Sequence, residues 1–410
     1  MSQRLSIQRN MLYNSIGSLF YLVCQWLINV LAVRLGSYEA GGMLSLAVQI
    51  TNVFFVIASF SIRVFQASDT EGRFSASRYV STRLVTSAIG FGLCAVFSVA
   101  SVQYSWEQRW SIILYMLFKL TESLVDCFAA EEQKAWRMDW CGISFLMRGV
   151  TSLGSFIIGM TVWHSLPAAL VLMALTTMPV VVWYDGRIVK KVTGFKLDFS
   201  LKKSLPLMQA AWPMMVNSGM MTMLTAIPRY FLEMYAGTEI LGIYTAIATP
   251  AVIMQAGCSF IYSPLVAPLS ETYHKGDRAA FRRTIAKALT AVLLLALLAV
   301  LAALLLGRWG LNLLFGESIL PHAHLLTPSL IAALCSALIY FFEVPLTIMQ
   351  RLKSMTVIHL IAIASTVILS MVLIPRMGMD GVNLTMHLCA GGDALAMGLW
   401  AFRCSKKGTC

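Results

Sequence analysis

Long apolar runs, separated by short polar connections, follow one another along almost the whole chain. Read with a window of about 19 residues, the sequence contains twelve runs long enough to cross a bilayer as helices. These runs are 11–33, 40–62, 84–103, 110–130, 140–162, 166–184, 207–228, 239–263, 285–306, 323–348, 355–374 and 382–402. The pattern therefore predicts an all-α polytopic membrane protein with about twelve transmembrane helices.

Composition supports this class and excludes others. Of the 410 residues, 58% are apolar and 12% are charged, against about 25% charged in ordinary soluble domains. This excludes a soluble globular protein, a disordered chain and a secreted disulfide scaffold. The nine cysteines form no Cys-x-x-Cys pair, so no metal site is predicted. The net charge of +12 comes from short basic bursts between the apolar runs, which favours anionic lipid head groups as partners and not nucleic acid.

The basic residues also predict the topology. When the connections are sorted by side, 24 of the 31 Lys and Arg fall on one side, which the positive-inside rule assigns to the cytoplasm. Because the number of runs is even, both termini are expected there. The predicted organisation is a first six-helix lobe (1–184), a basic cytoplasmic linker (185–206), a second six-helix lobe (207–402) and a basic cytoplasmic tail (403–410).

A weak duplication supports this division. At an offset of 200 residues, Glu39 matches Glu239 and Gly42 matches Gly242, and several polar positions recur with them. An even number of crossings separates the two halves, so they are expected to be parallel repeats.

Polar residues in the first two runs recur every three or four positions, which places them on one helical face. They are Asn14, Ser18, Tyr21, Gln25 and Asn29 in the first run, and Ser45, Gln49, Asn52, Ser59 and Arg63 in the second. Such a stripe serves either to hydrogen-bond neighbouring helices or to line a hydrated cavity. A similar stripe in the second half, Ser218, Thr222, Thr225 and Arg229 of the seventh run, favours the cavity.

The fourth run contains three charged residues, Lys119, Glu122 and Asp126, at spacings of three and four. Each would cost about 2.5–3.5 kcal/mol near the centre of the bilayer, so all three are expected to face the interior of the protein. Arg148 lies at a similar depth in the next run. Two explanations stay open: a structural network of ion pairs, or a site for a substrate phosphate or a coupling cation.

The second half contains its own buried polar residues. Glu343 and Asp393 lie within apolar runs and serve either as satisfied hydrogen-bond acceptors or as proton or sodium sites. His359 and His387 are lone histidines on apolar helices, and they are expected to be packing residues.

Several segments together resemble one family of transporters. They are Arg34-Leu35-Gly36 followed by Glu39 and Gly42, the segment from Arg63 to Asp69, the segment from Lys119 to Asp126, Arg148-Gly149, and Gly242-Ile243-Tyr244. The combination resembles the bacterial oligosaccharide-lipid flippases, or Wzx-type polysaccharide transporters, of the multidrug/oligosaccharidyl-lipid/polysaccharide exporter (MOP) superfamily. The resemblance covers most of the first 290 residues.

The resemblance implies two six-helix lobes around a central cavity in the bacterial plasma membrane. It further implies alternating-access flipping of undecaprenyl-diphosphate-linked oligosaccharide from the inner to the outer leaflet, alongside glycosyltransferases and a polysaccharide polymerase. The matching positions for the anionic head group are Arg63, Lys119 and Arg148, to which the stripes add Asn14, Gln25, Gln49 and Asn52. Coupling to a proton or sodium gradient, with no other cofactor, is expected at Glu122, Asp126 and Glu343.

Three alternatives compete with this hypothesis. A cation-coupled multidrug exporter of the same superfamily would favour an acidic, aromatic cavity, whereas the conspicuous residues here include three cations. A peptidoglycan-precursor flippase is expected to have two more helices. A membrane glycosyltransferase or polymerase needs a sizeable outer loop, and the longest here runs only about from Gly307 to Pro321. A transporter and not an enzyme is therefore predicted.

Overall fold

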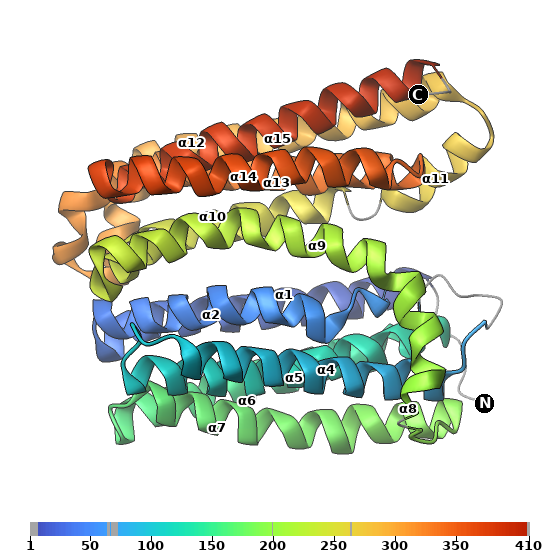
Figure 1. The fold of residues 1–410 in the computed structure, drawn as a ribbon, viewed down its shortest axis with the longest axis horizontal. Coiled ribbons are helices and arrows are strands. Elements are labelled where there is room, and N and C mark those ends of the chain that lie inside the picture. The colour runs from blue at the N-terminus through green and yellow to red at the C-terminus, as the bar shows by residue number, and fades with distance from the viewer. Residues whose placement is uncertain (1–6, 64–65, 67–72, 199, 263–264, 408–410) are drawn as a thin grey trace. The chain divides into compact units, whose positions relative to one another are not determined.

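The computed structural model describes residues 7–63, 66, 73–198, 200–262 and 265–407. The chain forms two compact units, Met1–Gly219 and Met220–Cys410, and Figure 1 shows the helices of each. Unit 1 contains α1 (Ile7–Leu31), η1 (Ala32–Gly36), α2 (Tyr38–Ser59), α4 (Ala76–Ala100), α5 (Trp106–Lys134), α6 (Met138–Val162), α7 (Leu166–Pro179), η2 (Val180–Asp185) and α8 (Gly186–Thr193). Helix α9 (Leu201–Ala236) carries the chain from unit 1 into unit 2.

Unit 2 is also built from long helices. It contains α10 (Thr238–Tyr262), α11 (Val266–His274), α12 (Arg278–Phe315), η4 (Glu317–Leu325), α13 (Leu326–Ile348), α14 (Leu352–Met377) and α15 (Met379–Lys407). The repeated helices α2 and α10 begin at Tyr38 and Thr238, which is the same offset of 200 residues that relates the two halves in sequence.

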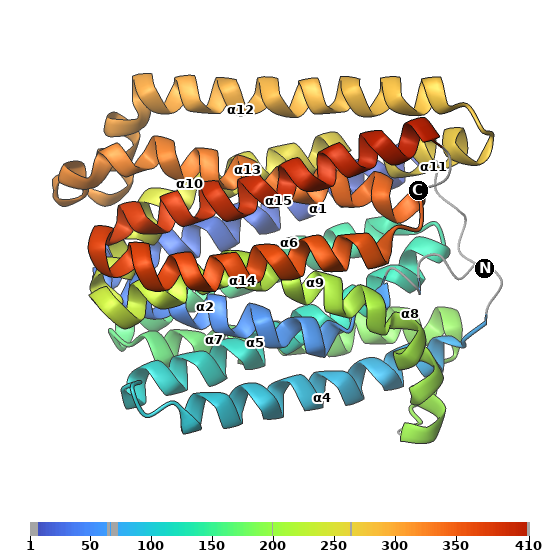
Figure 2. The same ribbon diagram turned by 45° about the horizontal axis from the view of Figure 1, so that its top comes forward.

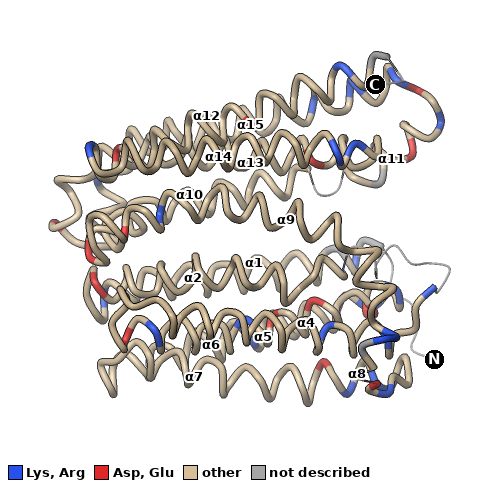
Figure 3. Tube along the Cα trace, in the orientation of Figure 1, with Lys and Arg blue, Asp and Glu red and all other residues tan. Residues whose placement is uncertain are grey.

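Most of each predicted apolar run lies on a helix, and among the described residues nine helical segments are long and apolar enough to cross a membrane. Helix α5 is not among the nine, because Lys119, Glu122 and Asp126 interrupt its apolar sequence. The all-helical prediction is therefore confirmed, and the chain is a multi-pass membrane protein. Figure 3 shows that Lys and Arg gather at helix ends, near α8 in unit 1 and near α11 in unit 2.

Capping side chains explain where several helices begin. The Ser37 hydroxyl accepts a hydrogen bond from the Ala40 amide at the start of α2. At the start of α5, Ser105 and Gln108 cap each other's backbone amides. These caps satisfy amide groups that have no partner within the helix.

The segment predicted as a linker, 185–206, is largely helical. Helix α7 continues through η2 into α8. On α8 the side chain of Val189 is buried, and the basic residues on either side of it in sequence are exposed. Helix α8 ends at Gly194, whose φ of +63° is left-handed and whose amide donates to the Lys190 carbonyl. A glycine adopts this conformation without a steric penalty and so ends the helix.

Helices α1 and α6 pack against each other at two glycines. A Cβ atom built on Gly17 would collide with the Gly142 backbone, and one built on Gly142 would collide with the Tyr13 carbonyl. Backbones approach this closely only where side chains are absent, as in other membrane helix pairs.

Replacing Gly142 by valine is therefore expected to separate α1 from α6. Overpacking of a close interface costs about 1–3 kcal/mol, so the variant should unfold at a lower temperature in detergent. Gly154→Val on the same helix is the matched control, because a Cβ there meets nothing within 4 Å. Equal unfolding temperatures for the two variants would contradict the glycine contact.

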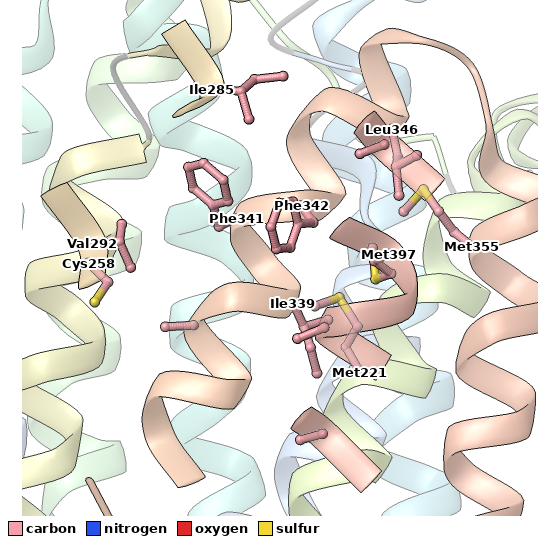
Figure 4. Packing of buried hydrophobic residues seen from close by; sticks show 14 of the residues in the cluster. Met221, Cys258, Ile285, Val292, Ile339, Phe341, Phe342, Leu346, Met355 and Met397 are labelled. Atoms are coloured by element: carbon pink, nitrogen blue, oxygen red, sulfur yellow. The ribbon is translucent and has the colours of Figure 1, made fainter. Parts of the chain in front are cut away.

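The core of unit 2 is a cluster of aromatic, methionine and aliphatic side chains around α13 and α15. Figure 4 shows Phe341 and Phe342 of α13 close to each other and near Met397 of α15.

Helix α12 lies along one side of unit 2 (Figure 2), and only 11% of its most apolar 18-residue window is buried. Its leucine-rich surface is suited to contact lipid directly.

Candidate functional site

The candidate site lies next to a break in the chain at the end of the second helix. Helix α2 ends at Ser59, and the next residues, Phe60 and Ser61, have φ angles of 48° and 49°. This left-handed conformation is unfavourable for residues other than glycine. The carbonyl groups released by the break are bound by α4: the Arg83 guanidinium donates to the Ser59 carbonyl, and the Thr86 hydroxyl donates to the Ala58 carbonyl at 2.8 Å.

Asp126 of α5 lies between two arginines. Its Oδ1 is 2.8 Å from Nη1 of Arg63, just after the break, and its Oδ2 is 3.1 Å from Nη2 of Arg83. The Arg83 side chain is fully buried, whereas that of Arg63 is 40% exposed. The buried arginine alone balances the Asp126 charge, so Arg63 is a surplus cation at an accessible position.

One turn earlier on α5, Lys119 and Glu122 form an ion pair with 2.5 Å between Nζ and Oε2. The Tyr21 hydroxyl of α1 donates a 2.6 Å hydrogen bond to the other Glu122 oxygen. The Lys119 ammonium also lies over the ring of Phe55, 5.0 Å from its centroid. Both charged side chains are partly buried, at 16% and 18% exposure.

Arg148 of α6 is almost completely buried, at 2% exposure. Its guanidinium carbon lies over the rings of Tyr21 and Phe145, at 4.7 and 5.1 Å from their centroids. Its Nε and Nη1 atoms have no hydrogen-bond partner among the described residues. Arg148 and Glu122 both contact Tyr21, Arg148 through the ring and Glu122 through the hydroxyl group. Tyr21 therefore lies between the charged residues predicted in the fourth and fifth runs.

These residues form one group, which we call the unit 1 charge cluster. Its charged members are Arg63, Arg83, Lys119, Arg148, Glu122 and Asp126. Four cations and two carboxylates give a net charge of +2. Asp185, which interacts with Arg148 from the end of η2, reduces this to +1 when ionised. The cluster keeps an excess of positive charge in either case.

The residues of the polar stripes, which were predicted to line a cavity, have different environments in the structure. Gln25 of α1 donates to the Ser152 hydroxyl of α6 at 3.1 Å, which is a contact between helices. Gln49 is buried on α2, while Asn14 and Asn52 are half-buried. A substrate-binding role for these four residues stays a prediction.

Sequence reasoning placed Arg83 in a cytoplasmic connection, and this was wrong. Helix α4 begins at Ala76, eight residues before the predicted run, and it buries Arg83 completely. Five of the eight residues 76–83 are Ser, Thr or Arg, so their mean hydropathy is low although the protein buries residues 79–83. Sequence reasoning also missed two acids, Glu132 and Asp185, which lie just beyond the ends of predicted apolar runs. Both are buried, and Asp185 accepts a 2.8 Å hydrogen bond from Ser144.

Glu343, predicted as a coupling acid, lies in unit 2 on α13. There it interacts electrostatically with His359 of α14 and Asp393 of α15. The sequence suggested that His359 is a packing residue, but its Nδ1 is 2.8 Å from Asp393 Oδ2.

Within the described part of the chain, no group of three His, Cys, Asp or Glu residues could hold a metal ion. Residues 64–65 and 67–69 of the motif after Arg63 lie outside the described residues.

The sequence and the fold are similar to those of known proteins. No family model matches the sequence. The capsular polysaccharide biosynthesis protein CapF of Staphylococcus aureus is 25% identical over 311 residues, which cover 75% of this chain and 77% of CapF.

Solved structures match nearly the whole chain. The lipid II flippase MurJ in an inward closed conformation has a TM-score of 0.75 at 13% identity, covering 95% of this chain and 87% of MurJ. A MOP superfamily transporter from Pyrococcus furiosus has a TM-score of 0.66 at 14% identity, covering 98% and 96% of the two chains. The chain has the MOP transporter fold. This is the fold that the resemblance in the sequence implies. A multidrug-resistance MATE transporter in an outward-facing conformation has the same fold, with a TM-score of 0.66 at 12% identity, covering 98% of this chain and 95% of that transporter.

Proposed function

We propose that this protein flips a lipid-linked oligosaccharide with a diphosphate head group from the inner to the outer leaflet of the bacterial plasma membrane, for assembly of a cell-surface polysaccharide. The observation that carries the proposal is the surplus of accessible positive charge in the unit 1 charge cluster. Arg63 and Lys119 are both partly exposed, while the carboxylates beside them are also held by the buried Arg83 and by Tyr21.

A diphosphate is the chemical group that fits such a site. Arginine binds phosphate oxygens through a planar fork of N–H donors, and lysine adds a compact charge. Because the partner carboxylates keep a second hydrogen-bond donor, Arg63 and Lys119 can turn to a phosphate without leaving an unpaired buried acid. The capsular polysaccharide role in the name of CapF supports a polysaccharide precursor as the substrate class.

The rest of the expected cycle follows from this assignment. We propose alternating access of the two units, with both termini in the cytoplasm. Glycosyltransferases would supply the lipid-linked substrate and a polymerase would consume it. The exposed basic residues of α8 are suited to contact anionic lipid head groups. Coupling at Glu122 and Asp126 stays a prediction, since cations of the protein occupy both carboxylates.

A deletion strain tests the proposal directly. Loss of the protein is expected to trap lipid-linked oligosaccharide in the inner leaflet, where it remains inaccessible to an external lectin or glycosidase in intact cells. The intact gene should restore surface polysaccharide. A strain that keeps its surface polysaccharide and becomes sensitive to cationic drugs would instead identify a multidrug exporter.

A further inference from the structure

Helix α9 contacts the break in α2 that places Arg63 in the unit 1 charge cluster. The ring of Trp212 lies 6.4 Å from the ring of Phe60, measured between centroids. Further along α9, the hydroxyl oxygen of Ser218 is 3.2 Å from that of Ser61. Phe60 and Ser61 are the residues of the break that have left-handed φ angles. Each of the two strained residues therefore contacts a side chain of α9.

The buried side of the break belongs to the same apolar cluster as α9. Leu207 and Ala211 of α9 are fully buried in this cluster, together with Phe60 and Ile62. Leu207, Ala211 and Ser218 follow one another at spacings of four and seven residues, which places them on one face of the helix. One face of α9 therefore packs at the end of α2, with apolar contacts first and a polar contact after them.

Backbone strain gives these contacts a role. Residues other than glycine keep left-handed backbone angles only where their surroundings hold them. Arg83 and Thr86 of α4 bind carbonyl groups that precede the strained pair, whereas α9 contacts the side chains of the pair itself. Without α9, the right-handed conformation is favoured at both positions. The α2 helix would then continue regularly, and Arg63 would turn away from its present direction.

Helix α9 is also the helix that joins the two units. The boundary between the units falls inside it, after Gly219, so the contacts with the break belong to unit 1 and the rest of the helix to unit 2. Pro213 lies between Trp212 and Ser218 and removes a backbone hydrogen bond, which lets the helix bend there. A change in the bend or rotation of α9 therefore acts directly on the break.

We propose that Trp212 and Ser218 of α9 are positioning residues, which hold Arg63 in the unit 1 charge cluster by keeping the break in α2. The inference rests on the proposed flippase function and deepens it, because it gives the helix between the units control over one head-group ligand. With α9 seated on the break, Arg63 lies beside Asp126 and can bind a phosphate. When α9 leaves the break, α2 straightens, and loss of this cation favours release of the head group.

Hydrogen exchange of the full chain in detergent tests the contacts without any substrate. Trp212→Ala/Ser218→Ala removes the ring and the hydroxyl group, and neither side chain is buried, so the variant should fold. Amides of residues 57–63 should exchange at least about tenfold faster than in the wild type, because a break that is not held opens more often. Trp309→Ala is the matched control, since it removes a 66% exposed tryptophan from α12. Equal exchange in the double variant and the wild type would overturn the proposal.

Binding of a fluorescent lipid diphosphate separates positioning from a general structural role. The double alanine variant should bind at least about tenfold more weakly than the wild type, as expected for loss of one charge-assisted hydrogen bond to phosphate. The conservative variant Trp212→Phe/Ser218→Thr, which keeps a ring and a hydroxyl group, should restore binding. In an Arg63→Ala background, the two alanine substitutions should change the affinity by less than about twofold, because their effect passes through Arg63.

Equal weakening in both backgrounds would show a general structural effect and overturn the proposal, as would wild-type affinity in the double alanine variant. A wild-type protein that does not bind the probe at all would contradict the flippase proposal instead. Hydrogen exchange would still decide in that case whether α9 holds the break, so the two failures are distinguishable.

Discussion

Replacing Arg63 and Lys119 together by alanine is expected to abolish measurable flipping while leaving the protein folded. Each charge-assisted hydrogen bond to a phosphate contributes about 1.5–3 kcal/mol, so loss of both weakens binding by at least about 100-fold. Both residues are partly exposed, and their carboxylate partners retain Arg83 and Tyr21 as donors. The change should therefore act on transport and not on stability.

The measurement is the initial rate at which reconstituted protein moves a fluorescent lipid-diphosphate oligosaccharide across the vesicle membrane. The matched control is Arg187→Ala/Lys190→Ala, which removes the same number of charges from the exposed face of α8. The control should flip at close to the wild-type rate. If the two double variants lose activity equally, a general charge effect at the membrane surface explains the result and the head-group assignment is wrong.

Replacing Asp126 by leucine is expected to have the largest effect on stability. Arg83 is fully buried and Asp126 is its ion-pair partner, so the variant leaves a buried cation without its counter-charge. Removing one member of a buried pair costs about 3–5 kcal/mol. Arg63 is 40% exposed and can turn toward water, so Arg83 determines the cost. The measurement is the free energy of unfolding in mixed detergent.

A second variant separates charge from packing in this experiment. Arg83→Met/Asp126→Leu replaces both charges by apolar side chains, and it should recover most of the lost stability because no buried charge remains. Asp198→Ala provides the control for a surface pair, since Asp198 and Lys203 are both exposed, and it should unfold like the wild type. A double variant as unstable as Asp126→Leu would show that the site depends on the shape of Asp126 and not on its charge.

The sequence by itself determined the helices of this protein. A bilayer requires runs of about 20 apolar residues, and no soluble fold imposes that demand, so the runs could be located without knowing how they pack. The pairing of Lys119 with Glu122 was also predictable, because residues three apart on one helix are neighbours. Helix ends were less certain, as the early start of α4 shows, since caps and buried polar faces leave little trace in hydropathy.

Only the tertiary structure decided which charges meet. Arg83 reaches Asp126 from α4, Tyr21 reaches Glu122 from α1, and His359 meets Asp393 across two helices. Such contacts depend on the rotation of each helix about its axis and on its height against its neighbours. Both are set by the fit of side chains in the packed bundle, and the spacing of residues along one helix contains no information about them.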